Sequence, residues 1–422
     1  MQPKIYCESD HHIDPSLIDS DALYVLHKLR QAGFIAYLVG GSVRDLLIKR
    51  RPKDFDISTD ARPEQIKAVF QRQCLLIGRR FRLAHIRFGH KVIEVATFRS
   101  GENVSDLITQ DNVWGSEQED VLRRDFTING LFYDAATHSI IDYVDGWSDI
   151  QNHLLRIIGD PEMRFKQDPV RLIRLLKFQA RYGFKIDPET AKCIASCLPE
   201  IKKSSPARVL EEILRMLESG YAQEFFRLMA HYHLLDLLFP ALTKWLHSAR
   251  GKKVFHYLAC ADQLYHHKGK NVLDRSALTA CLLFPILEIE LEKICASKKN
   301  PPHIGDITLT AATLVKSLLI HPFTHFPRRI TSQAVAILVS QYRITPLSKK
   351  RHSREKLFHS KEFVHALAFF KLRAMVNESH VELYKTMRDQ YHHFLHQREK
   401  KPHSPPQKSK PRSYRKRASH AS

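Results

Sequence analysis

Cysteine is scarce in this sequence, and no pattern ties the cysteines together. The seven cysteines are an odd number, and none belongs to a C-x-x-C pair. This distribution excludes a disulfide framework and argues against a zinc ribbon. With 43% hydrophobic and 26% charged residues, the 422-residue chain has the composition of a globular protein of two or three domains.

Long apolar runs are also missing. The best candidate, residues 277–287, is eleven residues long and contains Pro285, whereas a membrane-spanning helix needs about 20 apolar residues. The N-terminal segment holds acidic residues and paired histidines in place of the apolar core of a secretory signal. We therefore expect a cytoplasmic protein without a transmembrane segment.

Acidic residues are too few to balance the basic ones. The 66 Lys and Arg face 45 Asp and Glu, which gives a formal charge of +21. Residues 398–422 contribute nine basic residues, one acid and four prolines, and without them the charge is still +13. That C-terminal segment cannot form a core and is predicted to be a disordered basic tail. A cationic surface concentrates polyanions, so nucleic acid is the first partner to consider.

Motifs of several enzyme classes are absent. The sequence contains no G-x-x-x-x-G-K-[ST], no H-E-x-x-H and no G-x-S-x-G, which excludes the P-loop, zincin and serine hydrolase signatures.

The periodicity of apolar residues changes along the chain. Up to about residue 145, β-branched runs predict strands at 34–39, 54–58, 74–78, 83–88 and 92–98, with helices at 14–31, 42–48 and 63–71. Beyond residue 161 helical spacing dominates, with helices at 170–182, 188–197 and 206–219 and more to about residue 396. The pattern indicates a mixed α and β domain followed by a helical body.

One constellation in the mixed domain suits phosphate chemistry. Gly40-Gly41-Ser42 is followed, after eleven residues, by Asp54-Phe55-Asp56. On a strand, Asp54 and Asp56 share a face, and two carboxylates that close can hold a pair of Mg²⁺ ions. A glycine turn that leads into a helix offers bare backbone N–H groups to phosphate. The order predicts a nucleoside triphosphate site.

The segments V-G-G-S-V-R-D and K-D-F-D-I resemble the head of the DNA polymerase β nucleotidyltransferase superfamily. They are most similar to its class II branch, which contains tRNA CCA-adding enzymes and bacterial poly(A) polymerases. The resemblance implies an α+β fold, in which a nucleotidyltransferase head with a mixed sheet precedes an all-helical neck, body and tail. On that basis we divide the chain into an N-terminal helix (1–33), head (34–147), neck with a base-reading helix (148–220), RNA-binding body and tail (221–397) and disordered basic tail (398–422).

A second match is Arg123-Arg124-Asp125-Phe126-Thr127-Ile128-Asn129, which resembles the R-R-D-F-T-x-N segment of the family. The resemblance places Asp125 in the nucleotide pocket, either as the third catalytic carboxylate or as a ligand of the ribose 2′-hydroxyl. Arg123 and Arg124 could pair with triphosphate oxygens through their forked donors.

A third match, Gln167-Asp168-Pro169-Val170-Arg171, resembles the E-D-x-x-R motif that reads the base of the nucleotide in this family, with Gln167 in place of Glu. Asp168 and Arg171 are three residues apart, which predicts one helix face. A carboxylate and a guanidinium together suit adenine or cytosine. A basic stripe continues from this motif and is either a solvated face or a track for phosphates, with Arg174 assigned to the nucleotide and Lys177 and Arg181 to RNA.

The remaining basic segments are assigned to RNA. Residues 76–85 resemble a segment that marks the bacterial poly(A) polymerase branch, and its Arg79, Arg80 and Arg82 suit a phosphate backbone. The helix around residues 358–373 resembles the C-terminal region of the same branch. In the tail the assigned residues are Lys408, Lys410, Arg412, Arg415, Lys416 and Arg417, and the alternative is an appendage that only adds solubility.

The prediction is a template-independent nucleotidyltransferase that adds poly(A) to RNA 3′ ends from ATP and releases pyrophosphate. Asp54 and Asp56 would bind two Mg²⁺ ions, with Mn²⁺ as an alternative, and Asp125 would complete the acidic set. Phosphates would be held by Gly40, Gly41, Ser42 and Arg44. The expected partners are the 3′ ends of mRNA and other transcripts, together with RNA-decay or RNA-chaperone proteins. The alternatives are a CCA-adding enzyme and a catalytically inactive RNA-binding protein on the same fold.

Overall fold

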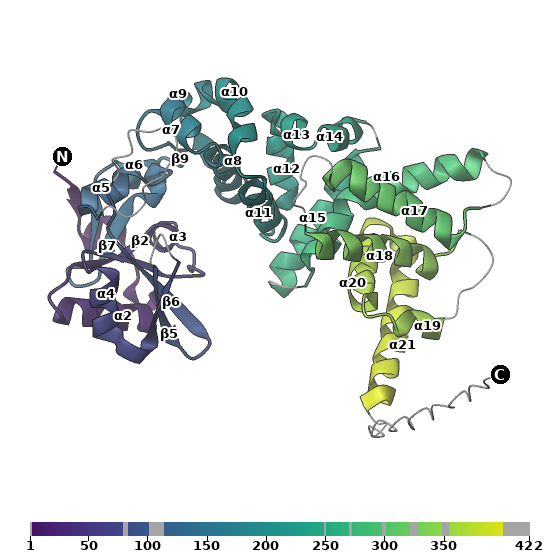
Figure 1. Ribbon diagram of the computed structural model, residues 1–422, viewed down its shortest axis with the longest axis horizontal. Coiled ribbons are helices and arrows are strands. Elements are labelled where there is room, and N and C mark those ends of the chain that lie inside the picture. The colour runs from purple at the N-terminus through teal and green to yellow at the C-terminus, as the bar shows by residue number, and fades with distance from the viewer. Residues whose placement is uncertain are drawn as a thin grey trace, which may run out of the picture.

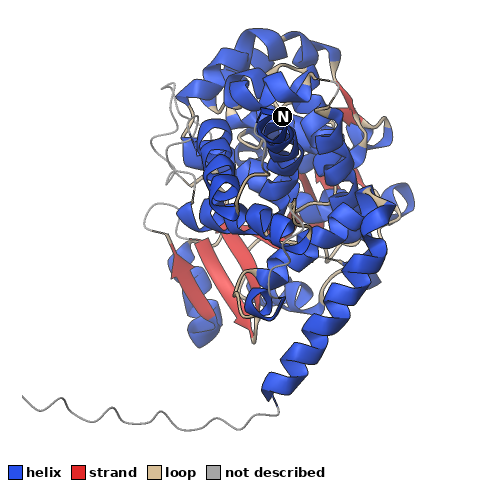
Figure 2. Ribbon diagram, turned by 90° about the vertical axis from the view of Figure 1, so that its right-hand side faces the viewer, coloured by secondary structure: helices blue, strands red, loops and turns tan. Residues whose placement is uncertain are grey.

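The computed structural model describes residues 2–78, 83–100, 114–248, 250–269, 272–297, 301–320, 327–347 and 354–399. These residues form an arch with the strands gathered at one end and helices along the rest (Figures 1 and 2). The predicted α+β class, with a mixed-sheet head followed by helical domains, is confirmed. The predicted RNA-binding residues Arg79, Arg80, Arg82, Lys408, Lys410, Arg412, Arg415, Lys416 and Arg417 lie outside the described residues.

The head is built on an eight-stranded sheet in the order β1-β8-β7-β2-β3-β6-β5-β4. Only the β3–β6 pair is parallel, and the other neighbours are antiparallel. The strands are β1 (Lys4–Tyr6), β2 (Ala36–Val39), β3 (Asp56–Thr59), β4 (Cys74–Ile77), β5 (Leu83–Phe88), β6 (Lys91–Thr97), β7 (Leu131–Asp134) and β8 (Ser139–Asp142). The helices and turns of the head are α1 (Glu8–His11), η1 (Pro15–Leu17), α2 (Ser20–Gln31), α3 (Gly41–Leu47), α4 (Pro63–Phe70), η2 (Gln71–Gln73), α5 (Glu117–Leu122), η3 (Thr127–Asn129) and α6 (Gly146–Gln151).

The neck and body are helical apart from a two-stranded parallel pair, β9 (Leu154–Leu155) with β10 (Lys185–Ile186). The neck contains α7 (Pro161–Gln167), α8 (Val170–Tyr182), α9 (Pro188–Lys192), α10 (Ile194–Cys197), η4 (Leu198–Lys203) and α11 (Pro206–Leu217). The body contains α12 (Ala222–His231), α13 (Leu234–Leu238), α14 (Pro240–Leu246), α15 (Lys252–Lys268), α16 (Arg275–Ser297), α17 (Ile304–Val315), η5 (Lys316–Ile320), α18 (Arg328–Ile344), α19 (Arg354–Phe358), α20 (Phe363–Val376), η6 (Glu378–His380) and α21 (Val381–Glu399). No described helix combines the length and hydropathy that a bilayer crossing requires.

Helix α8 is the central element of the fold because it is buried on two sides. Leu172, Leu175 and Phe178 pack into the core of the head. Val170, Ile173 and Leu176 pack into the core shared with the body. The two cores therefore meet along one helix, and the packing runs across the predicted boundaries at residues 147 and 220, which stay predictions.

Local sequence signals explain most element ends. Asp19 caps α2, because its Oδ1 accepts from the Asp21 N–H at 2.9 Å. This cap splits the predicted helix 14–31 into η1 and α2. The predicted helix 188–197 is likewise divided into α9 and α10, and the predicted strand 54–58 begins only at Asp56. The sequence analysis does not predict strands β1, β7 and β8, because each is short and none has a turn signal at both of its ends.

Gly220 lies at the junction between the neck and the body, where it packs closely against α15. Gly220 has φ +80°, and a Cβ on it would lie 2.4 Å from Cδ1 of Tyr265 in α15. Gly269 has nearly the same φ, +79°, but a Cβ there would meet nothing within 4 Å. The two glycines thus share the backbone constraint, and only Gly220 adds a steric one.

We expect Gly220→Ala to lower the free energy of unfolding by about 1–3 kcal/mol more than Gly269→Ala, because both carry the cost of a positive φ but only the first displaces an aromatic ring. Urea denaturation of the two variants measures the difference. Equal losses would contradict the assigned contact.

Candidate active site

The glycine turn lies between β2 and α3 and closes tightly. Gly40 has φ +67°, and a Cβ on it would lie 3.2 Å from Nη1 of Arg124. The Ser42 hydroxyl donates to the Val39 carbonyl at 3.0 Å and is buried. The lack of a side chain at Gly40 therefore lets the Arg124 guanidinium approach the backbone. The Ser42 hydroxyl holds the turn, and the assignment of Gly40, Gly41 and Ser42 to the nucleotide stays a prediction.

The Arg44 side chain is also held by contacts within the protein. Its Nε and Nη2 donate to Asp45 Oδ1 at 3.1 and 2.8 Å, and its Nη1 donates to Asn129 Oδ1 at 2.5 Å. The guanidinium stacks over the rings of Phe178 and Tyr182, and Arg44 is only 4% exposed. The predicted role of Arg44 as a phosphate ligand is therefore corrected to a link between the glycine turn, η3 and the neck.

Two carboxylates face each other across the parallel pair of strands. Asp56 begins β3, and its cross-strand partner on β6 is Glu94. Asp54 precedes the strand, and Phe55 between the two aspartates is buried in the head core. Asp54 and Asp56 are therefore both exposed with a buried residue between them, as the D-x-D pattern predicts. Glu94, which was not predicted, joins them from the neighbouring strand.

The negative charges of Asp54, Asp56 and Glu94 are not fully balanced by nearby cations. The pKa of Asp56 is raised to about 6, first because protein atoms surround the carboxyl group and then because of the negative charges of Glu94 and Asp54. Arg124 acts in the opposite direction with a smaller effect. Part of the Asp56 residue still faces solvent, so the site is crowded but open. Hard oxygen donors that repel one another are a suitable setting for a divalent cation.

The carboxylates fit a metal by chemistry, although they are not preformed as a cage. Within the described ranges, no three His, Cys, Asp or Glu side chains stand close enough together to hold an ion. Asp56 and Glu94 line a cavity of about 300 Å³ with Arg123 and Arg124. Asp54 lines a neighbouring cavity of about 580 Å³.

Asp125 contacts its own segment and the neck, and both roles predicted for it stay predictions. Its Oδ1 accepts from the Phe126 N–H and from Asn129 Nδ2, both at 2.9 Å. Its Oδ2 lies 3.8 Å from Nη1 of Arg174 on α8. Asp125 is thus neutralised by a basic environment in the neck, and the alternative role at the ribose agrees with this position.

An arginine that the sequence analysis missed fastens this segment to the neck. Arg164 on α7 donates from Nη2 to the carbonyls of Arg123 and Arg124 at 2.8 and 2.5 Å. Its Nη1 donates to Gln167 Oε1 at 3.3 Å, which gives the residue that replaces the family's Glu a defined contact. Burial and the charge of Arg171 lower the pKa of Arg164 to about 10.

The predicted base-reading pair lies at the junction of α7 and α8. Asp168 ends α7 and Arg171 lies in the first turn of α8, so they do not share one helix as predicted. Arg208 on α11 donates to Asp168 Oδ2 at 2.9 Å, while Asp168 Oδ1 is buried without a hydrogen-bond partner. Arg171 donates to the Arg164 carbonyl at 2.6 Å, and burial lowers its pKa. A buried carboxylate oxygen without a donor is costly, so Asp168 is suited to a ligand that supplies one.

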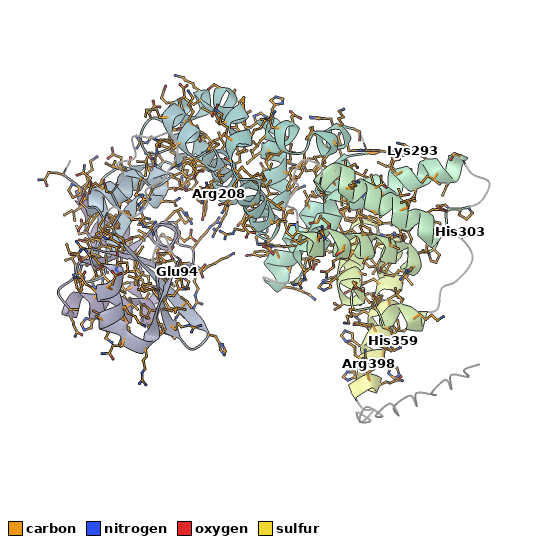
Figure 3. All side chains as sticks on the ribbon, in the orientation of Figure 1. Glu94, Arg208, Lys293, His303, His359 and Arg398 are labelled. Carbon is orange, nitrogen blue, oxygen red and sulfur yellow. The ribbon has the colours of Figure 1, made fainter. Side chains whose placement is uncertain are left out.

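The predicted basic stripe on α8 is largely neutralised. Arg174 and Lys177 each donate to Glu212 of α11 at 3.0 Å, and Arg181 donates to Asp45 at 3.2 Å. These pairs join the neck helices to one another and to the head. The assignment of Lys177 and Arg181 to RNA stays a prediction, and Arg174 also lies beside Asp125. Figure 3 labels Glu94 on the head and Arg208 on the neck above it.

The loop before Asp54 is anchored on the helical domains by aromatic residues. Arg50 donates to the Arg181 carbonyl at 3.2 Å, and its guanidinium lies 5.2 Å from the centre of the Tyr182 ring. Lys53 donates to the Tyr265 hydroxyl of α15 at 2.8 Å. The residues that precede the first aspartate therefore contact both the neck and the body.

Comparisons with known proteins agree with this geometry. A family described as "Poly A polymerase head domain" matches residues 36–156, and one described as "Probable RNA and SrmB- binding site of polymerase A" matches residues 183–246. Poly(A) polymerase I of Escherichia coli O6:H1 is 37% identical over 92% of this chain and 85% of its own length. The CCA-adding enzyme of Lactobacillus helveticus is 37% identical over 51% of this chain and 54% of its own length.

Among solved structures, the Bacillus stearothermophilus CCA-adding enzyme in complex with CTP has a TM-score of 0.65 and 24% identity, and the match covers 90% of this chain and 82% of that one. At this identity the likeness concerns the fold.

We expect Asp56→Asn to stabilise the metal-free protein at pH 7.5. Because the folded pKa of Asp56 lies above the ordinary value of 3.8, the folded state binds more protons, and its stability falls as pH rises from about 4 to 6. Removing the charge should raise the unfolding midpoint by about 1–2 °C at pH 7.5, and the gain should vanish near pH 4. Thermal denaturation in a chelator measures it, and an equal gain at both pH values would contradict the assigned cause.

Proposed function

The chain belongs to the class II nucleotidyltransferase family of poly(A) polymerases and CCA-adding enzymes, and from this we propose that it extends the 3′ ends of RNA with adenylate residues from ATP. The observation that carries the choice of poly(A) is the extent of the match. Identity to the E. coli poly(A) polymerase runs through head, neck and body, whereas the match to the L. helveticus CCA-adding enzyme covers about half of each chain.

In the proposed reaction the neck selects the nucleotide. The free Oδ1 of Asp168 would accept from the exocyclic amine of adenine, while Arg171 would donate to a neighbouring ring nitrogen. Arg208 holds the other carboxylate oxygen and so fixes the direction in which Asp168 points. Asp125, oriented by Asn129, would accept from the ribose hydroxyl.

The head would provide the phosphate and metal sites. Backbone N–H groups of the glycine turn, with Arg123 and Arg124, would bind triphosphate oxygens. Asp54, Asp56 and Glu94 would hold magnesium, or manganese, which when bound supplies the positive charge that activates the RNA hydroxyl and neutralises the departing pyrophosphate. The pairing of Asp56 with Glu94 across β3 and β6, and the position of Asp54 just before β3, support this assignment.

RNA binding is proposed for the helical domains and the tail. The family match at residues 183–246 supports contacts to RNA in the neck and body. The roles of Arg79, Arg80, Arg82 and the basic tail, mRNA as a substrate, a protein partner and a cytoplasmic location stay predictions.

The experiment that tests the activity is single-nucleotide incorporation. With a short RNA, Mg²⁺ and ATP alone, we expect long tails, and with CTP alone no extension. CTP addition to a tRNA that lacks its terminus would favour the CCA-adding alternative. Absence of incorporation with every nucleotide would favour the inactive RNA-binding alternative.

Two conservative variants separate the metal site from the nucleotide site. We expect Glu94→Gln to lower kcat by about 10²-fold or more with little change in the KM for ATP, because it removes a charge that acts on the reacting phosphate. Asp125→Asn should mainly raise the KM for ATP. Steady-state kinetics of both variants measure this split, and the reverse pattern would return Asp125 to the metal site.

A further inference from the structure

The order of strands places the two substrates on opposite sides of the carboxylates. The glycine turn follows β2, the carboxylates lie on or beside β3 and β6, and β5 and β4 complete the sheet beyond them. In an in-line displacement the attacking oxygen enters opposite the leaving group. If the triphosphate lies on the β2 side, the 3′-hydroxyl of the RNA must arrive from the side of β5 and β4.

A straight row of cross-strand partners leads in that direction. Asp56 on β3 is opposite Glu94 on β6, Glu94 is opposite His85 on β5, and His85 is opposite Leu75 on β4. His85 Nε2 lies 3.5 Å from Glu94 Oε1. Two strand spacings, about 10 Å, separate Glu94 from Leu75. The row therefore extends the catalytic face to the edge of the sheet.

This part of the sheet is open and apolar on the catalytic face. Its other face is buried, with Cys74, Ile86 and Ile93 in the head core and α4 against β4 and β5. On the catalytic face, Leu75 is 46% exposed, Ile77 40% and Val92 41%. Exposed apolar side chains grouped on one face of a sheet mark a binding surface more often than isolated ones do.

The surface carries a cation, Arg87, and the polar imidazole of His85 as well as apolar groups. His85 and the exposed Arg87 alternate with buried residues on β5, so they point to the catalytic face. Val92 and Asp54 line the same cavity of about 580 Å³, and the cavity of Asp56 and Glu94 includes Leu83 of β5. The open face is thus continuous with both cavities at the carboxylates. A ligand with flat apolar rings joined by anionic links matches this combination.

We propose that Leu75, Ile77, His85, Arg87 and Val92, which we call the strand platform, bind the 3′-terminal nucleotides of the RNA. The bases lie against the aliphatic side chains, Arg87 contacts a phosphate, and His85 lies beside the terminal ribose next to Glu94. The platform rests on the proposed function and adds the place of the RNA end to it. Figure 1 shows β5 and β6 on the side of the head that borders the open space under the arch.

The test uses the full-length double variant Leu75→Ser/Ile77→Ser in steady-state extension of an oligoadenylate with ATP and Mg²⁺. We expect the KM for RNA to rise about tenfold or more, as loss of base stacking does in other single-strand binders. The KM for ATP should stay within about twofold of the wild-type value, because the nucleotide pocket is on the other side of the carboxylates.

The matched control is Ile5→Ser. Ile5 is 66% exposed on β1, the opposite edge strand of the same sheet, where the buried residues Ile141, Phe132 and Val39 separate it from Asp56 along the row of cross-strand partners. We expect its KM values to match those of the wild type. If the double variant and the control have equal KM values for RNA, the strand platform is overturned. It is also overturned if the double variant extends RNA with wild-type kinetics and has lost only the binding of another protein.

A second measurement needs no variant. Wild-type protein is crosslinked to an oligoadenylate that ends in 4-thiouridine, and the modified peptides are mapped. Crosslinks in residues 74–77 or 83–92 support the platform, whereas crosslinks confined to the helical body overturn it. If the wild type extends RNA but neither result appears, only the platform is wrong. If the wild type extends no RNA, the proposed function itself fails.

Discussion

The burial of α8 between two hydrophobic cores is the constraint on which the site depends. A helix with one buried face could rotate or slide, but α8 is fixed by Leu175 on the head side and Ile173 on the body side. The first turn of α8 therefore holds Arg171 in a fixed position relative to the head. Arg164, which donates to the carbonyls of Arg123 and Arg124, joins the preceding helix to the head in the same way. Nucleotide selection and phosphate chemistry, which use different domains, are held in one geometry by packing.

Charge is divided between the two parts of the site. On the sheet, Asp54, Asp56 and Glu94 repel one another, and the pKa of Asp56 rises as a result. Where head and neck meet, acids are paired: Asp125 of the head lies beside Arg174 of the neck, and Asp168 of the neck pairs with Arg208. An unbalanced acidic group in a crowded site attracts cations, whereas a balanced one mainly orients hydrogen bonds. The difference explains why one group suits metal ions and the other suits the base and ribose.

The sequence was sufficient to predict the fold class, the bounds of β5 and α8, and the exposure of Asp54 and Asp56 on either side of a buried residue. These features follow from short-range periodicity and a local motif. It could not identify Glu94, since the partner of Asp56 depends on strand order and register across 38 residues of chain. For the same reason it left two roles open for Asp125. Lys177 and Arg181 look like open cations in sequence, but their acidic partners, Glu212 and Asp45, belong to helices whose packing no local pattern specifies. Arg44 directly precedes Asp45, yet the other residues that enclose its guanidinium, Asn129, Phe178 and Tyr182, come from distant segments.

The anchoring of Arg50 and Lys53 on Tyr182 and Tyr265 has a consequence for the motion of the head relative to the body. A head that swung away from the body after each addition would break both contacts and carry Asp54 out of register with its neighbours. We therefore expect the head and the body to keep their relative positions through successive additions, so that the growing RNA moves relative to a rigid protein.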